Sequence, residues 1–258
     1  MRFKLTLNID KKAFGNRLPL NYQYELSSFI YRAIARSDKD YASWLHSNGF
    51  RLDGKPFKLF TFSNLIVPAY GIEKEEARLR IDSNQVEWLV SFLPEASTER
   101  FVRGIFSEQT FQIGDKKSVV QFHVERIEVL SPPAFYSEMT FRTLSPVCIP
   151  LRNENWKYPK YISPNEKEAP QIILNNLINK YEAFYGSPYN GNRDFDWKVL
   201  SKPKAKLTTI KTGTPQESKI KGYLFDFEIK ADEELIKIAY SAGIAEKTSQ
   251  SFGMIEPI

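Results

Sequence analysis

The sequence predicts an α+β protein of two tandem ferredoxin-like domains, each with the order β-α-β-β-α-β and with insertions between these elements. Two observations support this prediction. The chain has 258 residues, enough for two ordinary hydrophobic cores. Strand-like and helix-like patterns follow one another in the same order on both sides of Pro132 and Pro133. We therefore expect domains over residues 1–131 and 134–258.

The first half supplies its elements in the expected order. Arg2 to Ile9 alternates polar and apolar residues, as a half-buried strand does. Tyr22 to Ala35 repeats apolar residues at helical spacing, and a capping box of Ser37 and Asp40 then predicts a short helix that ends near Gly49. We expect further strands over 57–67, 77–81, 101–113 and 119–130, and a helix over 86–93 that stops at Pro94.

The second half repeats the order with a longer first helix. A strand is expected over 139–144, a helix over 168–185, and strands over 197–210 and 220–229 joined by a polar turn at 213–215. Asp232 is a suitable N-cap for the last helix, and Gly243 stands where a helix ends. A short strand over 252–255 follows. Because ferredoxin-like domains serve many functions, this order does not assign one.

Composition narrows the class of protein. Hydrophobic residues make up 42% and charged residues 26%, as in soluble globular proteins. The single cysteine, Cys148, rules out an internal disulfide framework and fits a reducing compartment. The chain has no signal-peptide core and no apolar run of membrane-spanning length, so we expect a cytoplasmic protein. The net charge of +5 favours an acidic partner.

The loop between Gly243 and Gly253 has the character of an anion-binding segment. It carries a cation, two hydroxyls and an amide on Lys247, Thr248, Ser249 and Gln250, and no bulky apolar residue follows Ile244 until Phe252. Backbone N–H groups and small donors of this kind suit a polyanion. An ordinary helix cap followed by a polar turn is the alternative, and these residues alone leave both open.

A lysine-rich stretch lies just before this last helix. Residues 198–221 hold seven lysines and one acid, Glu217. Lys202, Lys204 and Lys206 alternate with other residues, so an extended chain would place them on one face. Such a stripe can follow the phosphates of a nucleic acid, or it can protect an edge strand against aggregation.

Few residues offer other chemistry. The two histidines are His46 and His123, and their spacing suggests no metal site. Taken singly, His46 is a helix-end residue, Tyr31 a half-buried tyrosine beside the apolar stripe of the first helix, and Lys58 an edge residue. None of them assigns a function by itself.

Taken together, these segments resemble the CRISPR-associated repeat-processing endoribonucleases, "CRISPR-associated protein six" of the RAMP superfamily. The N-terminal matches are Asn21 to Ala35, Leu45-His46 and Lys58 to Ser63, and Thr143 to Val147 resembles the entry to the second domain. The C-terminal loop matches the family's glycine-rich pattern at Gly243-Ile244, Glu246-Lys247, Ser249 and Phe252-Gly253. Ala245 and Ser251 stand where the family has glycines, and Thr248 where asparagine is common.

This resemblance implies a metal-independent endoribonuclease that cuts precursor CRISPR RNA within each repeat. It implies a catalytic triad of Tyr31, His46 and Lys58. In RNA the 2′-hydroxyl is the nucleophile, so a histidine can transfer the protons, a lysine can offset charge on the phosphate, and a tyrosine can orient it. The expected products carry a 2′,3′-cyclic phosphate and a 5′-hydroxyl.

The resemblance also implies the partners. We expect CRISPR repeat RNA to bind Gly243, Lys247, Thr248, Ser249 and Gln250 of the loop and Lys202, Lys204 and Lys206 of the lysine-rich strand. No cofactor, metal or membrane is expected, whereas contact with CRISPR effector proteins and homodimerisation stay open. The alternatives are a non-catalytic subunit that binds repeat RNA within a ribonucleoprotein and a ferredoxin-like protein unrelated to RNA.

Overall fold

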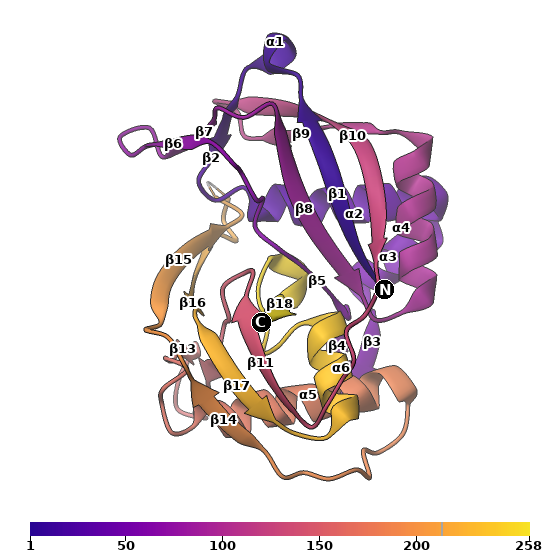
Figure 1. Cartoon of the computed structure of the whole chain (residues 1–258), viewed down its shortest axis with the longest axis vertical. Coiled ribbons are helices and arrows are strands. Elements are labelled where there is room, and N and C mark those ends of the chain that lie inside the picture. Colours follow the sequence, from indigo (N-terminus) through magenta and orange to yellow (C-terminus); the bar gives the residue numbers. More distant parts are fainter. Residues whose placement is uncertain (213) are drawn as a thin grey trace.

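Two lobes lie one above the other along the long axis of the molecule in the computed structural model, which describes residues 1–212 and 214–258 (Figure 1). The N-terminal lobe is built on an antiparallel five-stranded sheet with the order β5-β8-β1-β10-β9. Its strands are β1 (Arg2–Ile9), β5 (Phe60–Phe62), β8 (Gln85–Phe92), β9 (Thr110–Gly114) and β10 (Val119–Leu130). Its helices are α2 (Gln23–Ser37), α3 (Lys39–Ser47) and α4 (Glu95–Ser107).

The C-terminal lobe has an antiparallel four-stranded sheet with the order β14-β17-β11-β18. Its elements are β11 (Glu138–Thr143), α5 (Ala169–Tyr185), β14 (Asp196–Val199), β17 (Asp226–Lys230), α6 (Glu233–Ala242) and β18 (Ile255–Pro257). Each lobe thus contains a β-α-β-β-α-β unit, formed in the N-terminal lobe by β1, α2, β5, β8, α4 and β10 with β9 added at the edge of the sheet. In both units the first strand lies between the third and fourth. The predicted pair of ferredoxin-like domains is confirmed, while the limits 1–131 and 134–258 stay a prediction.

The remaining elements are insertions. In the N-terminal lobe they are α1 (Lys11–Phe14), the sheet of β2 (Arg17–Pro19), β6 (Tyr70–Glu73) and β7 (Arg78–Ile81), and the hairpin of β3 (Phe50–Leu52) and β4 (Lys55–Phe57). In the C-terminal lobe they are the pair β12 (Pro150–Leu151) and β13 (Lys160–Tyr161), the hairpin of β15 (Lys204–Ile210) and β16 (Ser218–Leu224), and the 3₁₀ turn η1 (Thr248–Gln250). Of the turn predicted at 213–215, Gly213 lies outside the described residues.

The prediction exchanged a helix and a strand in the N-terminal lobe. The helix predicted over 86–93 is the strand β8 (Gln85–Phe92), and residues 101–107 belong to α4 rather than to a strand. In β8 both faces are covered, so nearly every residue from Val86 to Phe92 is buried, and such an apolar run does not distinguish strand from helix. Pro94 is the N-cap of α4, not the end of a preceding helix.

Smaller corrections concern the ends of elements. Asp38, not Ser37, caps α3, because its carboxylate accepts a hydrogen bond from the Tyr41 amide at 2.9 Å. The strand predicted over 57–67 breaks after Phe57, and the strands predicted over 197–210 and 220–229 each divide in two. The last strand begins at Ile255 rather than at Phe252. The predicted N-cap Asp232 is confirmed, since it accepts from the Glu234 amide at 2.9 Å.

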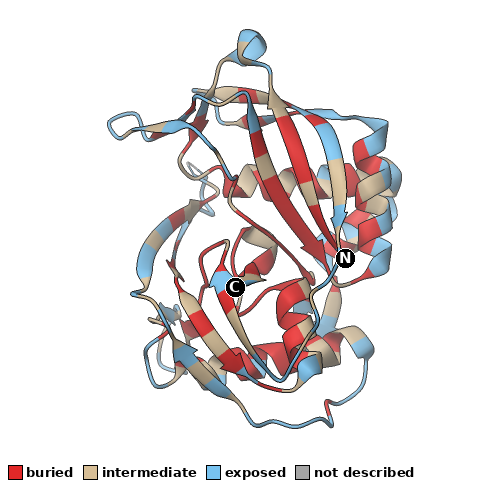
Figure 2. Cartoon of the chain, viewed as in Figure 1, coloured by how far each residue is buried: buried red, intermediate tan, exposed pale blue. Residues whose placement is uncertain are grey.

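The two lobes are joined by a buried cation. The guanidinium of Arg2, only 3% exposed, donates to the carbonyl oxygens of Tyr240 at 2.6 Å and Ile255 at 2.8 Å, and it lies 3.6 Å from the centre of the Tyr240 ring. Burial lowers the pKa of Arg2 to about 10. Figure 2 shows buried residues in each core and along β5 and α6, where the lobes meet. Within the described part of the chain, no helix combines the length and apolar character needed to cross a bilayer.

Gly104 allows α2 and α4 to approach closely, which leads to a first prediction. A Cβ at Gly104 would lie 1.7 Å from the Ala33 carbonyl oxygen, so Gly104→Ala should force the helices apart and lower the free energy of unfolding by roughly 2 kcal/mol or more, as measured by urea denaturation. Gly186→Ala is the control: a Cβ there meets open space, and only the left-handed φ of 66° should cost about 1 kcal/mol. Equal losses in the two variants would contradict this account.

Candidate active site

Two neighbouring pockets lie where the N-terminal lobe faces the loop between Gly243 and Gly253. The first, here called the Tyr31 pocket, has a volume of about 330 Å³. The second, here called the Asn176 pocket, has a volume of about 350 Å³. Lys58, Ser249 and Gln250 line both, so the pockets adjoin. The Tyr31 pocket is lined by Tyr24, Ser27, Ser28, Tyr31, His46, Lys58, Lys211, Ser249 and Gln250.

The Tyr31 pocket brings together the three residues that the resemblance singled out. Tyr31 comes from α2, His46 from the last turn of α3, and Lys58 from the segment after β4. The rings of Tyr31 and His46 meet edge to face, with centroids 5.1 Å apart and planes at 81°. Lys58 Nζ donates to the backbone carbonyl of His46 at 2.7 Å. The pocket thus presents an imidazole, a phenol and an ammonium to the same space.

The local backbone explains why these side chains converge. Gly49 ends the α3 turn with a left-handed φ of 59°, and a Cβ there would lie 2.5 Å from the Phe57 carbonyl oxygen and 3.2 Å from Lys58 Cδ. Glycine therefore lets the chain that carries Lys58 pass against the end of α3. The next residue, the buried Leu59, has a φ of 53° and turns the chain from β4 into β5. Strained backbone of this kind is common at functional sites.

Burial shifts the pKa of two of the three groups. It raises the pKa of the Tyr31 phenol above its ordinary value, against a smaller opposite effect of a hydrogen bond with Ser249, so Tyr31 is a neutral hydrogen-bond donor. Burial also lowers the pKa of the Lys58 ammonium, and the nearby charge of Arg51 lowers it further. A partly desolvated cation beside a neutral phenol is suited to bind an anion.

The loop that covers these residues follows an unusual path. Ala245, Lys247 and Ser251 all have left-handed φ values, of 57°, 60° and 65°. The amide of Ile244 donates to the Gly253 carbonyl oxygen at 2.8 Å and closes the loop, and a Cβ at Gly253 would lie 2.0 Å from the Ile244 carbonyl oxygen. Ala245 and Ser251, which replace glycines of the resembled pattern, therefore adopt the backbone conformation that glycine favours.

A buried lysine holds the loop in place. Lys180 of α5 is 3% exposed, and its Nζ donates to the carbonyl oxygens of Gly243 at 2.6 Å and Ala245 at 3.0 Å. Burial lowers the pKa of Lys180 to about 7, with the charge of Glu246 acting in the opposite direction. Sequence reasoning missed Lys180 because a lysine within a helical pattern is usually exposed.

Further contacts hold the loop, three of them to the N-terminal lobe and one to Arg152 of the C-terminal lobe. Ser27 Oγ of α2 donates to the Ser249 carbonyl oxygen at 2.7 Å, and Thr61 Oγ1 of β5 donates to the Phe252 carbonyl oxygen at 3.0 Å. The loop carboxylate of Glu246 forms ion pairs with Lys55 at 2.6 Å and with Arg152 at 2.7 Å. These bonds fix Ser249 beside Tyr31.

Four of the five loop residues predicted to bind RNA lie at these pockets, whereas Gly243 and the lysine stripe do not. Lys247 and Thr248 line the Asn176 pocket, Ser249 and Gln250 line both pockets, and Gly243 is the buried C-cap of α6. Lys202 and Lys204 line a separate groove with Arg142, and Lys202 precedes β15. Lys204 and Lys206 share a face of β15 with the buried Thr208 and Ile210, and burial lowers the pKa of Lys206.

The lysine that does reach the Tyr31 pocket is Lys211, at the end of β15. It belongs to the lysine-rich stretch, but nothing in the sequence distinguishes it from its neighbours. Tyr24 and Ser27 were also missed, although both lie in the segment that matched the resembled family. Among residues 1–212 and 214–258, no group of three or more His, Cys, Asp and Glu side chains is arranged to hold a metal ion.

Comparisons with known proteins agree on one family. A model described as "CRISPR associated protein Cas6, C-terminal" matches residues 130–257, and one described as "CRISPR-associated protein Cas6, N-terminal" matches residues 17–127. A relative from Pyrococcus furiosus named CRISPR-associated endoribonuclease Cas6 is 29% identical over 256 residues, which are 99% of this chain and 89% of the relative.

Similar solved structures indicate the same family. One described as "CRISPR associated protein Cas6" is 30% identical with a TM-score of 0.74, covering 100% of this chain and 99% of that chain. One described as "An RAMP protein binding different RNA substrates" is 26% identical with a TM-score of 0.83 and the same coverage.

The burial of Lys180 leads to a second prediction. Its pKa is about 7 in the folded protein against an ordinary 10.5, so between these pH values the folded state binds fewer protons than the unfolded chain. The free energy of unfolding of the unmodified protein, relative to that of the Lys180→Met variant, should therefore rise with pH across this window by up to about 1.4 kcal/mol per pH unit. Below about pH 7 this difference should stay level. Urea denaturation at several pH values measures this difference.

The control for this measurement is Lys230→Met, which removes an exposed lysine at the end of β17. This variant should follow the pH dependence of the unmodified protein. If Lys180→Met also followed the pH dependence of the unmodified protein, the prediction would be wrong, because burial of the ammonium would then not lower the free energy of unfolding.

Proposed function

This chain belongs to the Cas6 family of CRISPR-associated proteins, and we propose on this premise that it is an endoribonuclease that cuts precursor CRISPR RNA within its repeats, without a metal ion. The observation that carries the proposal is the convergence of Tyr31, His46 and Lys58 on one pocket beside the glycine-rich loop. The name of the P. furiosus relative supports the activity, and the similar RAMP structure, described as binding RNA, supports RNA as the ligand.

The proposed reaction needs only groups that the RNA and the pocket supply. The 2′-oxygen of the RNA forms a bond to the adjacent phosphorus and loses its proton, while the bond from phosphorus to the 5′-oxygen breaks and that oxygen gains a proton. His46 serves as the general acid or the general base in these transfers. The products are a 2′,3′-cyclic phosphate and a 5′-hydroxyl.

Lys58 and Tyr31 act on the phosphate rather than on the protons. The Lys58 ammonium offsets the negative charge that builds on the phosphate oxygens, and the partial desolvation of Lys58 makes this interaction stronger than it would be in water. The neutral phenol of Tyr31 donates a hydrogen bond to the 2′-oxygen or to the phosphate and so holds the reacting atoms in line.

RNA binding is proposed to extend from the pockets. Lys247, Thr248, Ser249 and Gln250 contact the RNA around the cut, together with Lys211, while the buried Gly243 sets the path by which the loop reaches it. Lys202 and Lys204 contact flanking phosphates from their own groove, and Lys206 adds charge beside them. The released guide RNAs then pass to CRISPR effector proteins.

A third prediction tests the assigned chemistry. Because His46 transfers a proton in the proposed reaction, His46→Ala should lower the single-turnover rate of cleavage of repeat RNA in EDTA by about 10²–10⁴-fold and leave RNA binding unchanged. The matched control is His123→Ala, which removes the exposed histidine of β10 that lies 3.2 Å from Thr110 Oγ1. This control should cut at the unmodified rate.

Several outcomes would contradict the assignment. An undiminished rate in His46→Ala, or cleavage that requires magnesium, would exclude the mechanism proposed. RNA with a 2′-deoxy sugar at the cut site should bind but resist cleavage, since it lacks the nucleophile. A protein that binds repeat RNA tightly and never cuts it would be a non-catalytic RNA-binding subunit instead.

A fourth prediction concerns Lys211. If its ammonium meets a phosphate in the Tyr31 pocket, Lys211→Ala should weaken RNA binding and reduce the slope of log Kd against log salt concentration by about 0.7, the value for one contact to a single strand. Filter binding over a range of salt concentrations measures the slope. Lys219→Ala, an exposed lysine of the same hairpin outside the Tyr31 pocket, is the control and should change the slope less.

A further inference from the structure

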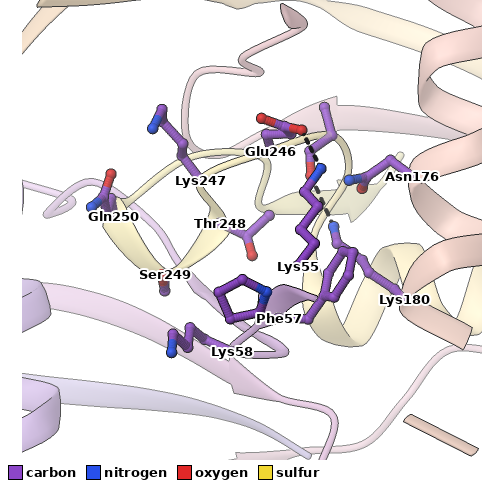
Figure 3. A pocket seen from close by; sticks show the side chains of 12 residues that line it. Lys55, Phe57, Lys58, Asn176, Lys180, Glu246, Lys247, Thr248, Ser249 and Gln250 are labelled. Atoms are coloured by element: carbon purple, nitrogen blue, oxygen red, sulfur yellow. Dashed lines mark hydrogen bonds and ion pairs between the residues drawn. The ribbon is translucent and has the colours of Figure 1, made fainter. Parts of the chain in front are cut away.

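The interior of the Asn176 pocket, away from Lys58, has no role in the reaction described above, yet it adjoins the reacting groups. Its walls come from both lobes: the β3–β4 hairpin and the residues after it supply Lys55, Phe57 and Lys58, and α5 supplies Asn176 and Lys180. The loop over residues 245–250 forms the remaining side (Figure 3). Its volume of about 350 Å³ lies within the range of pockets that hold small organic groups, about 300 to 1,000 Å³.

The pocket combines an apolar wall with a few polar groups. Phe57 is 7% exposed and lines the pocket, and Lys55 Nζ lies 5.6 Å from the centre of its ring. Cations stand at the edge, on Lys58 and Lys247, and Figure 3 shows them on the side where the loop passes toward Ser249. An aromatic wall with cations at one edge suits a nucleotide, whose base is flat and whose phosphate is charged.

The amide of Asn176 has no partner that explains its position. The residue is only 6% exposed, and its Oδ1 has no hydrogen-bond partner among the described residues. Buried polar atoms are nearly always paired in folded proteins, so an unpaired one beside a cavity points to a ligand that completes it. Thr248, also 7% exposed, lines the same pocket from the loop.

We propose that the Asn176 pocket binds the base of one of the two nucleotides that flank the scissile phosphate, and that it prefers adenine. This assignment rests on the proposed function, because the shared residues Lys58, Ser249 and Gln250 place the pocket directly beside the one that holds the reacting phosphate. The phosphodiester passes Lys58 between the pockets, and the base turns in toward Asn176.

Adenine follows from the chemistry of the amide. Asn176 offers a donor and an acceptor side by side, and in the proposed pose the base turns its Hoogsteen edge to this amide, where adenine presents the complementary pair, an acceptor at N7 and a donor at N6. Guanine presents two acceptors on the same edge, so one of them would face the amide oxygen. Pyrimidines are smaller and fill less of the cavity. Asn176 is therefore a specificity residue rather than a catalytic one.

A fifth prediction tests this specificity with the full-length protein and repeat RNAs that carry adenine, guanine, cytosine, uracil or no base at each flanking position. The readouts are kcat/KM for cleavage and Kd for matched RNAs with a 2′-deoxy sugar at the cut site. At one position, the unmodified protein should favour adenine over guanine or no base by about tenfold or more in both readouts, the discrimination of one good bidentate contact.

The variant and its control isolate Asn176. Asn176→Ala should reduce the preference for adenine about tenfold. On the RNA without a base, its kcat/KM and Kd should equal those of the unmodified protein. Asn175→Ala is the control, since this exposed neighbour on α5 pairs with Gln171 outside the pocket and should keep the preference. Because the RNA substitutions need no variant, the preference can be judged even if Asn176→Ala folds poorly.

The outcomes separate this inference from the proposed function. Equal cleavage and binding of all bases at both positions by an active protein would overturn the base pocket and leave the nuclease assignment standing. A uniform loss on every RNA in Asn176→Ala would also overturn it, since that is the effect of a structural residue. Binding that prefers adenine without any cleavage would support the pocket and overturn the nuclease.

Discussion

The buried ammonium of Lys180 is the contact on which the rest of the site depends. Placing a charge inside a protein is costly, and here hydrogen bonds to the carbonyl oxygens of Gly243 and Ala245 offset part of that cost. These carbonyls belong to the start of a loop whose left-handed residues leave it little freedom to rearrange. This cation on α5 therefore holds the loop where it leaves α6, and the Ser27 hydroxyl then holds Ser249 against the N-terminal lobe.

Left-handed backbone conformations at residues other than glycine are concentrated around the same site. Leu59, Ala245, Lys247 and Ser251 all have left-handed backbone although none is glycine. Each of them either lines one of the two pockets or is the sequence neighbour of a residue that does. Conflicts of this kind are expected where function rather than stability sets the conformation, and the surrounding packing has to hold them. Hydroxyls of β5 and α2 do so by donating to loop carbonyls.

Sequence reasoning reached the fold and the family but not the whole site. The fold class was right, but a helix was predicted over β8 and a strand over the end of α4. Both faces of β8 are covered, so its residues do not alternate between apolar and polar as those of a half-buried strand do. The resemblance, confirmed by two family models, supplied Tyr31, His46 and Lys58; no periodicity did. Asn176 and Lys180 look like solvent-facing residues of α5, and only the docking of the hairpin and loop over them makes them buried.

The position of the two lobes is itself part of the site, because both pockets take walls from both of them. Arg2 ties β1 to α6 and β18, and an apolar cluster of Phe57, Leu59, Ala183 and Ala242 closes the contact next to Lys58. That cluster keeps water from one side of Lys58, in line with the lowering of its pKa by burial. An ammonium already stripped of part of its water loses less on meeting a phosphate. The apolar contact that joins the lobes thus also prepares the cation for its anion.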